Sequence, residues 1–154
     1  MQVTEALPRA RADLPDTCVR DSAILCRMSD APLPRSDNAP ARRLDMPALA
    51  VGHRGAVLAS ADGSLEQLVS AATVGRLSDG LVPMVCHAPA TARRLNTSPF
   101  PALDLLELYA FVRPARFCRP TPSGLADALE LEPPDGLEDE ARLLQLAGGV
   151  LLTD

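Results

Sequence analysis

The chain has no tryptophan and no lysine, and its other aromatic side chains are few. Its 154 residues include one Tyr and three Phe, although hydrophobic residues make up 47% of the sequence. Leu, Val and Ala must therefore supply most of any packed core. The length fits one domain, or one domain and a tail.

The cysteine pattern lacks the spacing of a zinc site. None of the four cysteines forms a C-x-x-C pair with another; they are Cys18, Cys26, Cys86 and Cys118. Paired ligands of that kind are what structural zinc sites use, so we expect reduced thiols in a cytoplasmic protein. No apolar run approaches the roughly 20 residues of a membrane span. No signal peptide opens the chain, and we expect no membrane association.

Acidic charge is concentrated after residue 46. Residues 1–46 contain seven arginines and seven acids, whereas residues 47–154 contain eight arginines and thirteen acids, a net charge of −5. Phosphate neutralisation supplies most non-specific nucleic-acid affinity and needs a positive surface. The charge therefore argues against tight nucleic-acid binding, while a local arginine cluster could still contact a backbone.

Residues 1–46 predict a disordered N-terminal extension. Prolines occur at positions 8, 15, 32, 34 and 40, and proline interrupts helices and removes sheet donors. No sustained helical or strand periodicity appears there. Met28 is a plausible alternative start. A binding arm is the other interpretation, and it would use Arg9, Arg11, Arg42 and Arg43.

The body, residues 47–154, predicts an α/β fold of the ribonuclease H-like kind, a mixed sheet with flanking helices. Apolar runs indicate strands over 48–52, 56–60, 64–69 and 82–86, and Asp62-Gly63 is a strong hairpin signal between the second and third. Pro83 indicates that the fourth strand lies near an edge of the sheet, or that the proline is among the first residues of that strand. Helices are expected over 70–80, 89–95, 101–112, 121–131 and 135–149.

Several helix details follow from local rules. The helix over 101–112 is apolar around most of its circumference, which predicts that it is largely buried. Thr121 or Ser123 is the expected cap of the next helix. Asp135 and Glu138 have capping-box spacing, and Gly148-Gly149 can end the last helix.

One strand-to-helix corner lacks the acids that sheet enzymes place there. The stretch "VPMVCHAPATARRL" ends a strand at a histidine, and no Asp or Glu lies between Gly80 and Leu103. The stretch "CHAPATARRLNTSPFPALDLLELYAFVRP", Cys86 to Pro114, resembles part of the DnaQ-like 3′–5′ exonuclease pattern. The chain resembles more closely the amino-terminal module of bacterial DinG-type (XPD-like) ATP-dependent DNA helicases. That likeness spans most of residues 47–146, and its specific part is Leu103 to Ala126.

Departures from these families shape the expected function. A DnaQ-like nuclease needs carboxylates that converge on two metal ions, yet residues 47–61 contain no acid and Ala92 stands about where an Asp should be. Asp104 matches a family Asp that does not bind metal. No Walker A loop is present. The resemblance therefore implies a non-catalytic accessory module, truncated at its C-terminal end, with no cofactor of its own; ATP and Mg would belong to the parent helicase.

The partners implied by the resemblance are helicase motor domains, in cis or in trans, and DNA through the parent protein. Two alternatives stay open: a small free-standing hydrolase using His87 and Asp104, or an adaptor that binds protein only. The apolar residues 143–152 predict an exposed face at the chain's end and self-association of the isolated chain.

The chemically capable residues each have a structural interpretation as well. His87 is a candidate general base or a locally bonded histidine. Asp104 with Glu107 could serve acid–base catalysis or form a solvated helix start. The four aromatics are expected in the core and not as base-stacking platforms; they are Phe100, Tyr109, Phe111 and Phe117. Five arginines could meet phosphate, an acidic neighbouring domain or structural salt bridges: Arg93, Arg94, Arg113, Arg116 and Arg119.

Overall fold

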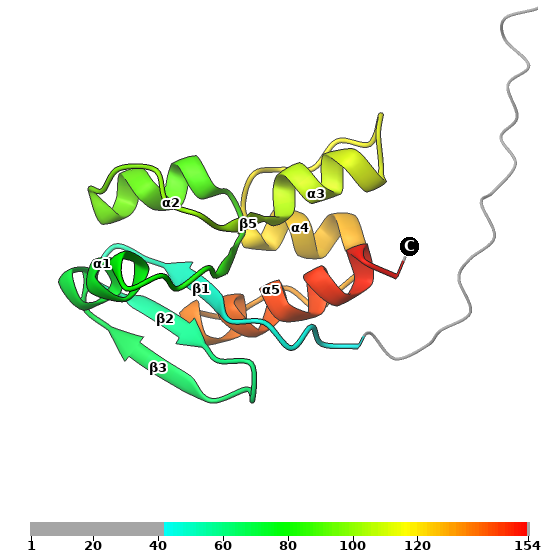
Figure 1. Cartoon of the computed structure of the whole chain (residues 1–154). Coiled ribbons are helices and arrows are strands. Elements are labelled where there is room, and N and C mark those ends of the chain that lie inside the picture. Colours follow the sequence, from blue (N-terminus) through cyan, green and yellow to red (C-terminus); the bar gives the residue numbers. More distant parts are fainter. Residues whose placement is uncertain (1–41, 154) are drawn as a thin grey trace, which may run out of the picture. The chain divides into compact units, whose positions relative to one another are not determined.

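A computed structural model describes residues 42–153, whose centre is a five-stranded mixed sheet with flanking helices (Figure 1). Strand order across the sheet is β3-β2-β1-β4-β5. β2 is antiparallel to β1 and β3, whereas β4 is parallel to β1 and β5. The strands are β1 (Ala48–Val51), β2 (Ala56–Ala59), β3 (Leu65–Leu68), β4 (Met84–Val85) and β5 (Leu103–Asp104). The α/β prediction is confirmed at this level.

Most of the predicted N-terminal extension, with the alternative start at Met28, lies outside the described residues. The folded body nevertheless begins before the expected boundary at Pro47. Leu44 and Met46 pack against the core, and the Leu44 N–H donates to the carbonyl of Gln145 at 3.0 Å.

The β2–β3 hairpin confirms the Asp-Gly signal, with a longer loop than two residues. Ala59 pairs with Leu65, so residues 60–64 form the connection. Gly63 has a φ of +89°, a conformation that glycine adopts without a Cβ clash. Asp62 Oδ1 accepts hydrogen bonds from the N–H and the hydroxyl of Ser64, at 2.9 and 2.7 Å. The aspartate thus shapes the turn through its side chain.

Helices cover both faces of the sheet. β1 alternates, since Ala48 and Ala50 belong to one apolar cluster and Leu49 and Val51 to the other. The first cluster packs under α3, α4 and α5, and the second under α1 and α2. The helices are α1 (Ser70–Ser78), α2 (Ala88–Leu95), α3 (Leu105–Val112), α4 (Pro122–Leu129) and α5 (Leu137–Leu151). No helix in the described part combines the length and the apolar character needed to cross a membrane.

Pro83 directly precedes β4, and β4 lies next to the edge strand β5, so the strand is near an edge and the proline is at its start, as both alternatives predicted. Thr121 caps α4, because its hydroxyl accepts from the Gly124 N–H at 3.0 Å. The expected capping box of α5 was wrong: its N-cap is Gly136, and no side chain caps it.

Gly148 and Gly149 do not end α5, which continues to Leu151. Both glycines are buried, and their missing side chains permit close packing. A Cβ at Gly148 would stand 2.9 Å from Met84 Sδ, and one at Gly149 would overlap the carbonyl oxygen of Arg42. These glycines serve helix packing instead of helix termination.

The exposed apolar residues lie elsewhere than predicted. The expectation that 101–112 is largely buried was wrong, because only Leu105 and Tyr109 of α3 are buried. Two of the four aromatics predicted for the core are on the surface, Phe111 at 84% and Phe117 at 85% exposure. The chain's end behaves in the opposite way: Leu143, Leu144 and Leu151 are buried, and of the predicted apolar face Leu152 is the exposed member.

Candidate functional site

The carboxyl ends of the parallel strands β1, β4 and β5 meet at one edge of the sheet. Ligands of open α/β sheets bind outside this edge, so a functional site is expected here. Val51 ends β1, Cys86 and His87 follow β4, and Asp104 ends β5. The structure therefore brings the two candidate catalytic residues to the same edge.

Asp104 is a buried double cap. Its Oδ1 accepts the N–H groups of Leu106 and Glu107, at 3.0 and 3.2 Å, at the start of α3. Its Oδ2 accepts the N–H of Ala88, the first residue of α2, at 2.7 Å. Asp104 was expected at a solvated helix start. Its position at a helix start is confirmed, but the residue is only 7% exposed, so the expected solvation was wrong.

The Asp104–Glu107 pair does not present two adjacent carboxylates. Both oxygens of Asp104 are bonded to backbone N–H groups, whereas Glu107 is exposed and supplies one of those N–H groups. A carboxylate that accepts three backbone N–H groups holds two helix starts in place. Its geometry favours the structural interpretation over acid–base catalysis.

His87 is the N-cap residue of α2, in extended conformation and without a side-chain capping bond. Its contribution to the helix comes from the backbone: the carbonyl oxygen accepts from the N–H and the hydroxyl of Thr91, each at 3.0 Å. The ring is half-buried. His87 and Asp104 share the edge, but the carboxylate has no free oxygen with which to orient the imidazole.

Arg94 is hydrogen-bonded to the end of β1. Its Nη1 donates to the carbonyl oxygen of Val51 at 2.8 Å, which ties α2 to the last residue of β1. Burial raises the pKa of Glu140 on α5, and the positive charge of Arg94 opposes that rise. One of the five arginines proposed for phosphate, although exposed, therefore has a hydrogen-bond partner within the body.

The thiol of Cys86 has a raised pKa. Burial, reinforced by Cys118 and Asp104, raises its pKa to about 12. Burial also raises the pKa of Cys118. Since the thiolate is the nucleophilic form, neither thiol is activated at neutral pH.

The described residues do not assemble the ligand set of a two-metal nuclease. β1 is Ala-Leu-Ala-Val throughout, and Ala92 is a buried helix residue. Within residues 42–153, no three His, Cys, Asp or Glu side chains come together as metal ligands would. The resemblance to DnaQ-like exonucleases thus finds no metal-binding counterpart in this part of the chain.

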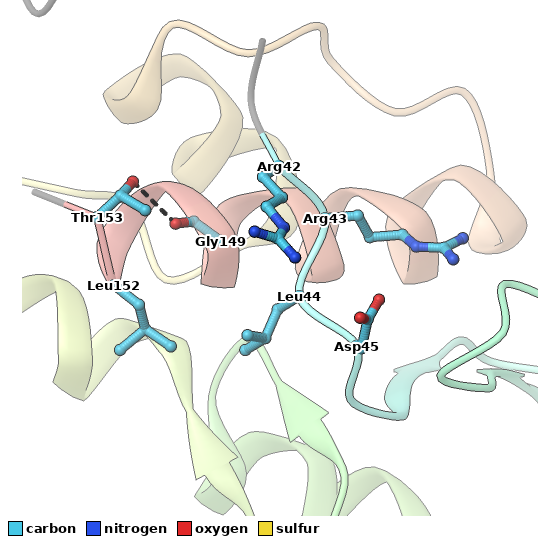
Figure 2. Close-up of a pocket in the computed structure, with 7 residues that line it drawn as sticks. All are labelled: Arg42, Arg43, Leu44, Asp45, Gly149, Leu152 and Thr153. Atoms are coloured by element: carbon cyan, nitrogen blue, oxygen red, sulfur yellow. Dashed lines mark hydrogen bonds between the residues drawn. The ribbon is translucent and has the colours of Figure 1, made fainter. Parts of the chain in front are cut away.

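Two surface hollows are formed by other residues, and the second borders the end of β1, since Ala56 in its wall pairs with Val51. One of about 290 Å³ is formed by residues 42–45 and the last turn of α5, where the Thr153 hydroxyl donates to the Gly149 carbonyl (Figure 2). The other, of about 650 Å³, lies between β2, β3 and the start of α5, with Asp135, Glu138 and Asp139 in its wall. Neither hollow includes His87 or Asp104 in its lining.

Arg93 is exposed on α2, and the loop between α3 and α4 holds the other three candidate arginines. Arg113 Nη1 donates to the Ala128 carbonyl at 3.3 Å, and Arg119 forms an ion pair with Asp127. Arg116 is exposed. The salt-bridging interpretation therefore holds for Arg119.

The sequence analysis expected Phe111, at the end of α3, and Phe117, within this loop, in the core. The alternation of aromatic and basic residues in "FVRPARFCR" was the available signal for exposure.

No family model matches this chain, and neither the curated proteins nor the solved structures include a match to it.

Proposed function

We propose that the body is a ribonuclease H-like module that assists a separate catalytic domain and performs no nuclease reaction itself. Its topology supports the class. Three antiparallel strands come first, and β4 and β5 then add parallel to β1 through helical connections. Such a sheet, with helices on both faces, is the arrangement expected of that class.

One observation carries the proposal: at the sheet edge where β1, β4 and β5 end, hereafter the carboxyl edge, the charged side chains hold the fold together. A two-metal nuclease needs carboxylates that face a shared metal pair about 3.5–4 Å apart. Here the edge acid, Asp104, gives both oxygens to helix starts. Arg94, a cation, is bonded to the end of β1 where the family pattern requires acids.

The more particular proposal is an accessory module of a DinG-type ATP-dependent DNA helicase. It rests on the resemblance of Leu103 to Ala126, which forms β5, α3, the following loop and half of α4. ATP and Mg would be bound by the motor domains, in cis or in trans. A cytoplasmic location and DNA contact through the assembled helicase belong to the same proposal.

Mixing the full chain with purified DinG-type motor domains tests this proposal. We expect association in sedimentation velocity and a change in DNA-dependent ATP hydrolysis by the motor. The genomic DNA beside this coding sequence should also encode a Walker A lysine. A chain that neither binds the motor nor alters its turnover would contradict the helicase assignment.

A further inference from the structure

Two exposed phenylalanines flank the tight turn after α3. Phe111 is 84% and Phe117 85% exposed, although burying such a ring would contribute roughly 1.5–3 kcal/mol. Other large exposed hydrophobics of the described region, Val69, Val82 and Leu152, lie on different elements. Most of the surface of the two rings is therefore accessible to a partner.

The turn between the rings is preorganised. The Arg116 N–H donates to the Arg113 carbonyl at 3.3 Å, Pro114 follows Arg113, and Ala115 has a φ of +71°. Proline at the second position and a positive φ at the third are the features of a type II turn. The chain reverses at the end of α3 before it enters α4 (Figure 1). Preorganised surfaces lose less entropy on binding.

Positive charge is interleaved with these rings. Residues 108–126 contain Arg113, Arg116 and Arg119 and no acid. Arg119 pairs with Asp127, both partners being more than half exposed, so that pair is weak. Glu107, one helical turn before Phe111, is the acid that opposes this charge on α3.

We infer that this aromatic–arginine loop, residues 111–119, binds single-stranded nucleic acid, with bases stacked on Phe111 and Phe117 and phosphates near the arginines. Sequence-tolerant strand binding combines these two elements, aromatic faces and a positive backbone track. A protein-docking patch would instead surround the aromatics with buried apolar area. The inference deepens the proposed function. It rests on that function because the bound strand would be part of the helicase substrate.

Fluorescence anisotropy with the full chain and a labelled oligothymidylate of about 16 nucleotides tests the inference, since that length covers the site of a small strand-binding fold. We expect Phe111→Ala and Phe117→Ala each to weaken binding about tenfold. Arg116→Ala should lower the slope of log affinity against log salt by about 0.7. Glu107→Gln should strengthen binding, because it removes a repulsive charge.

Matched controls come from exposed sites elsewhere. Val69→Ala and Arg142→Ala remove an exposed apolar and an exposed basic side chain and should leave affinity unchanged. Because the chain lacks tryptophan, Phe117→Trp creates a single reporter whose emission a stacked base should quench. Val69→Trp should show no quenching.

Each outcome bears on the inference. Equal affinity of the loop variants and the wild-type chain, or no binding at low salt, would overturn it. So would loop variants that weaken motor association and leave strand affinity intact, because the loop would then dock protein. A chain that binds the motor but no strand refutes this inference alone, whereas strand binding without any motor effect refutes only the helicase assignment.

Discussion

Replacing Asp104 tests the double-cap assignment, because capping and catalysis predict different consequences. Asp104→Ala removes the acceptor of the Glu107 N–H of α3 and of the Ala88 N–H of α2. It also removes one of two acceptors of the Leu106 N–H, which donates to the Cys86 carbonyl at 3.1 Å as well. Asp104→Asn keeps one acceptor oxygen but presents an amide N–H₂ to the other helix. If the carboxylate is structural, both variants must lose stability.

The contacts set the size of the loss. Losing an N-cap costs typically about 1 kcal/mol, and a hydrogen bond to a charged group contributes about 1.5–3 kcal/mol. We therefore expect Asp104→Ala to lower the free energy of unfolding by about 2–4 kcal/mol. Asp104→Asn, which can keep the α3 cap, should lose about 1.5–3 kcal/mol.

Urea titration followed by circular dichroism measures both variants. Asp79→Ala is the matched control, since Asp79 is exposed at the C-terminal end of α1 and its removal should change stability by less than about 0.5 kcal/mol. An Asp104→Ala protein as stable as the wild type would refute the double-cap reasoning and reopen the catalytic interpretation.

Three further predictions concern buried groups. Gln145→Leu removes two 2.9 Å hydrogen bonds from a fully buried amide to backbone carbonyls and should cost about 2–3 kcal/mol in urea titrations; an unchanged midpoint would contradict this. Gly149→Ala should destabilise the protein by about 1–3 kcal/mol through overpacking. Gly75→Ala, in open space on α1, should instead stabilise it by up to about 1 kcal/mol. Melting temperatures that shift in the same direction in both variants would contradict the packing role of Gly149. Because burial raises the folded-state pKa of Cys86 from 9.0 to about 12, its contribution to stability is complete below pH 9 and declines as pH rises toward 12, by up to about 1.4 kcal/mol per pH unit. Cys86→Ala should flatten that decline in pH-dependent unfolding, and an equally steep decline would show that another group titrates.

Features determined by neighbouring residues were predictable. The β2–β3 hairpin follows from Asp62-Gly63, and the start of α2 follows from Pro89 after His87. Features determined by distant contacts were not. Gly149 suggests a helix end by local rules, yet the approach of Arg42, more than a hundred residues earlier, makes it a packing glycine.

The candidate site shows the same division. The sequence drew attention to His87 at a strand end and to Asp104 within a predicted helix, and the structure places both at the edge of the sheet where the parallel strands end, because residues 103–104 form the unpredicted strand β5. The role of Asp104 could not be predicted, because its partner Ala88 lies 16 residues away and is brought near by the parallel pairing of β4 with β5. The exposure of Phe111 depends likewise on which face of α3 meets α5.

Degradation of single-stranded DNA is the most direct test of the claim that the carboxyl edge is structural. The full chain, in molar excess over a 5′-labelled oligonucleotide, is incubated with Mg²⁺ or Mn²⁺ and compared with its Asp104→Asn and His87→Ala variants. The account predicts an intact oligonucleotide in every lane. Metal-dependent shortening from the 3′ end by the wild-type chain, lost in either variant while the variant remains folded, would contradict it.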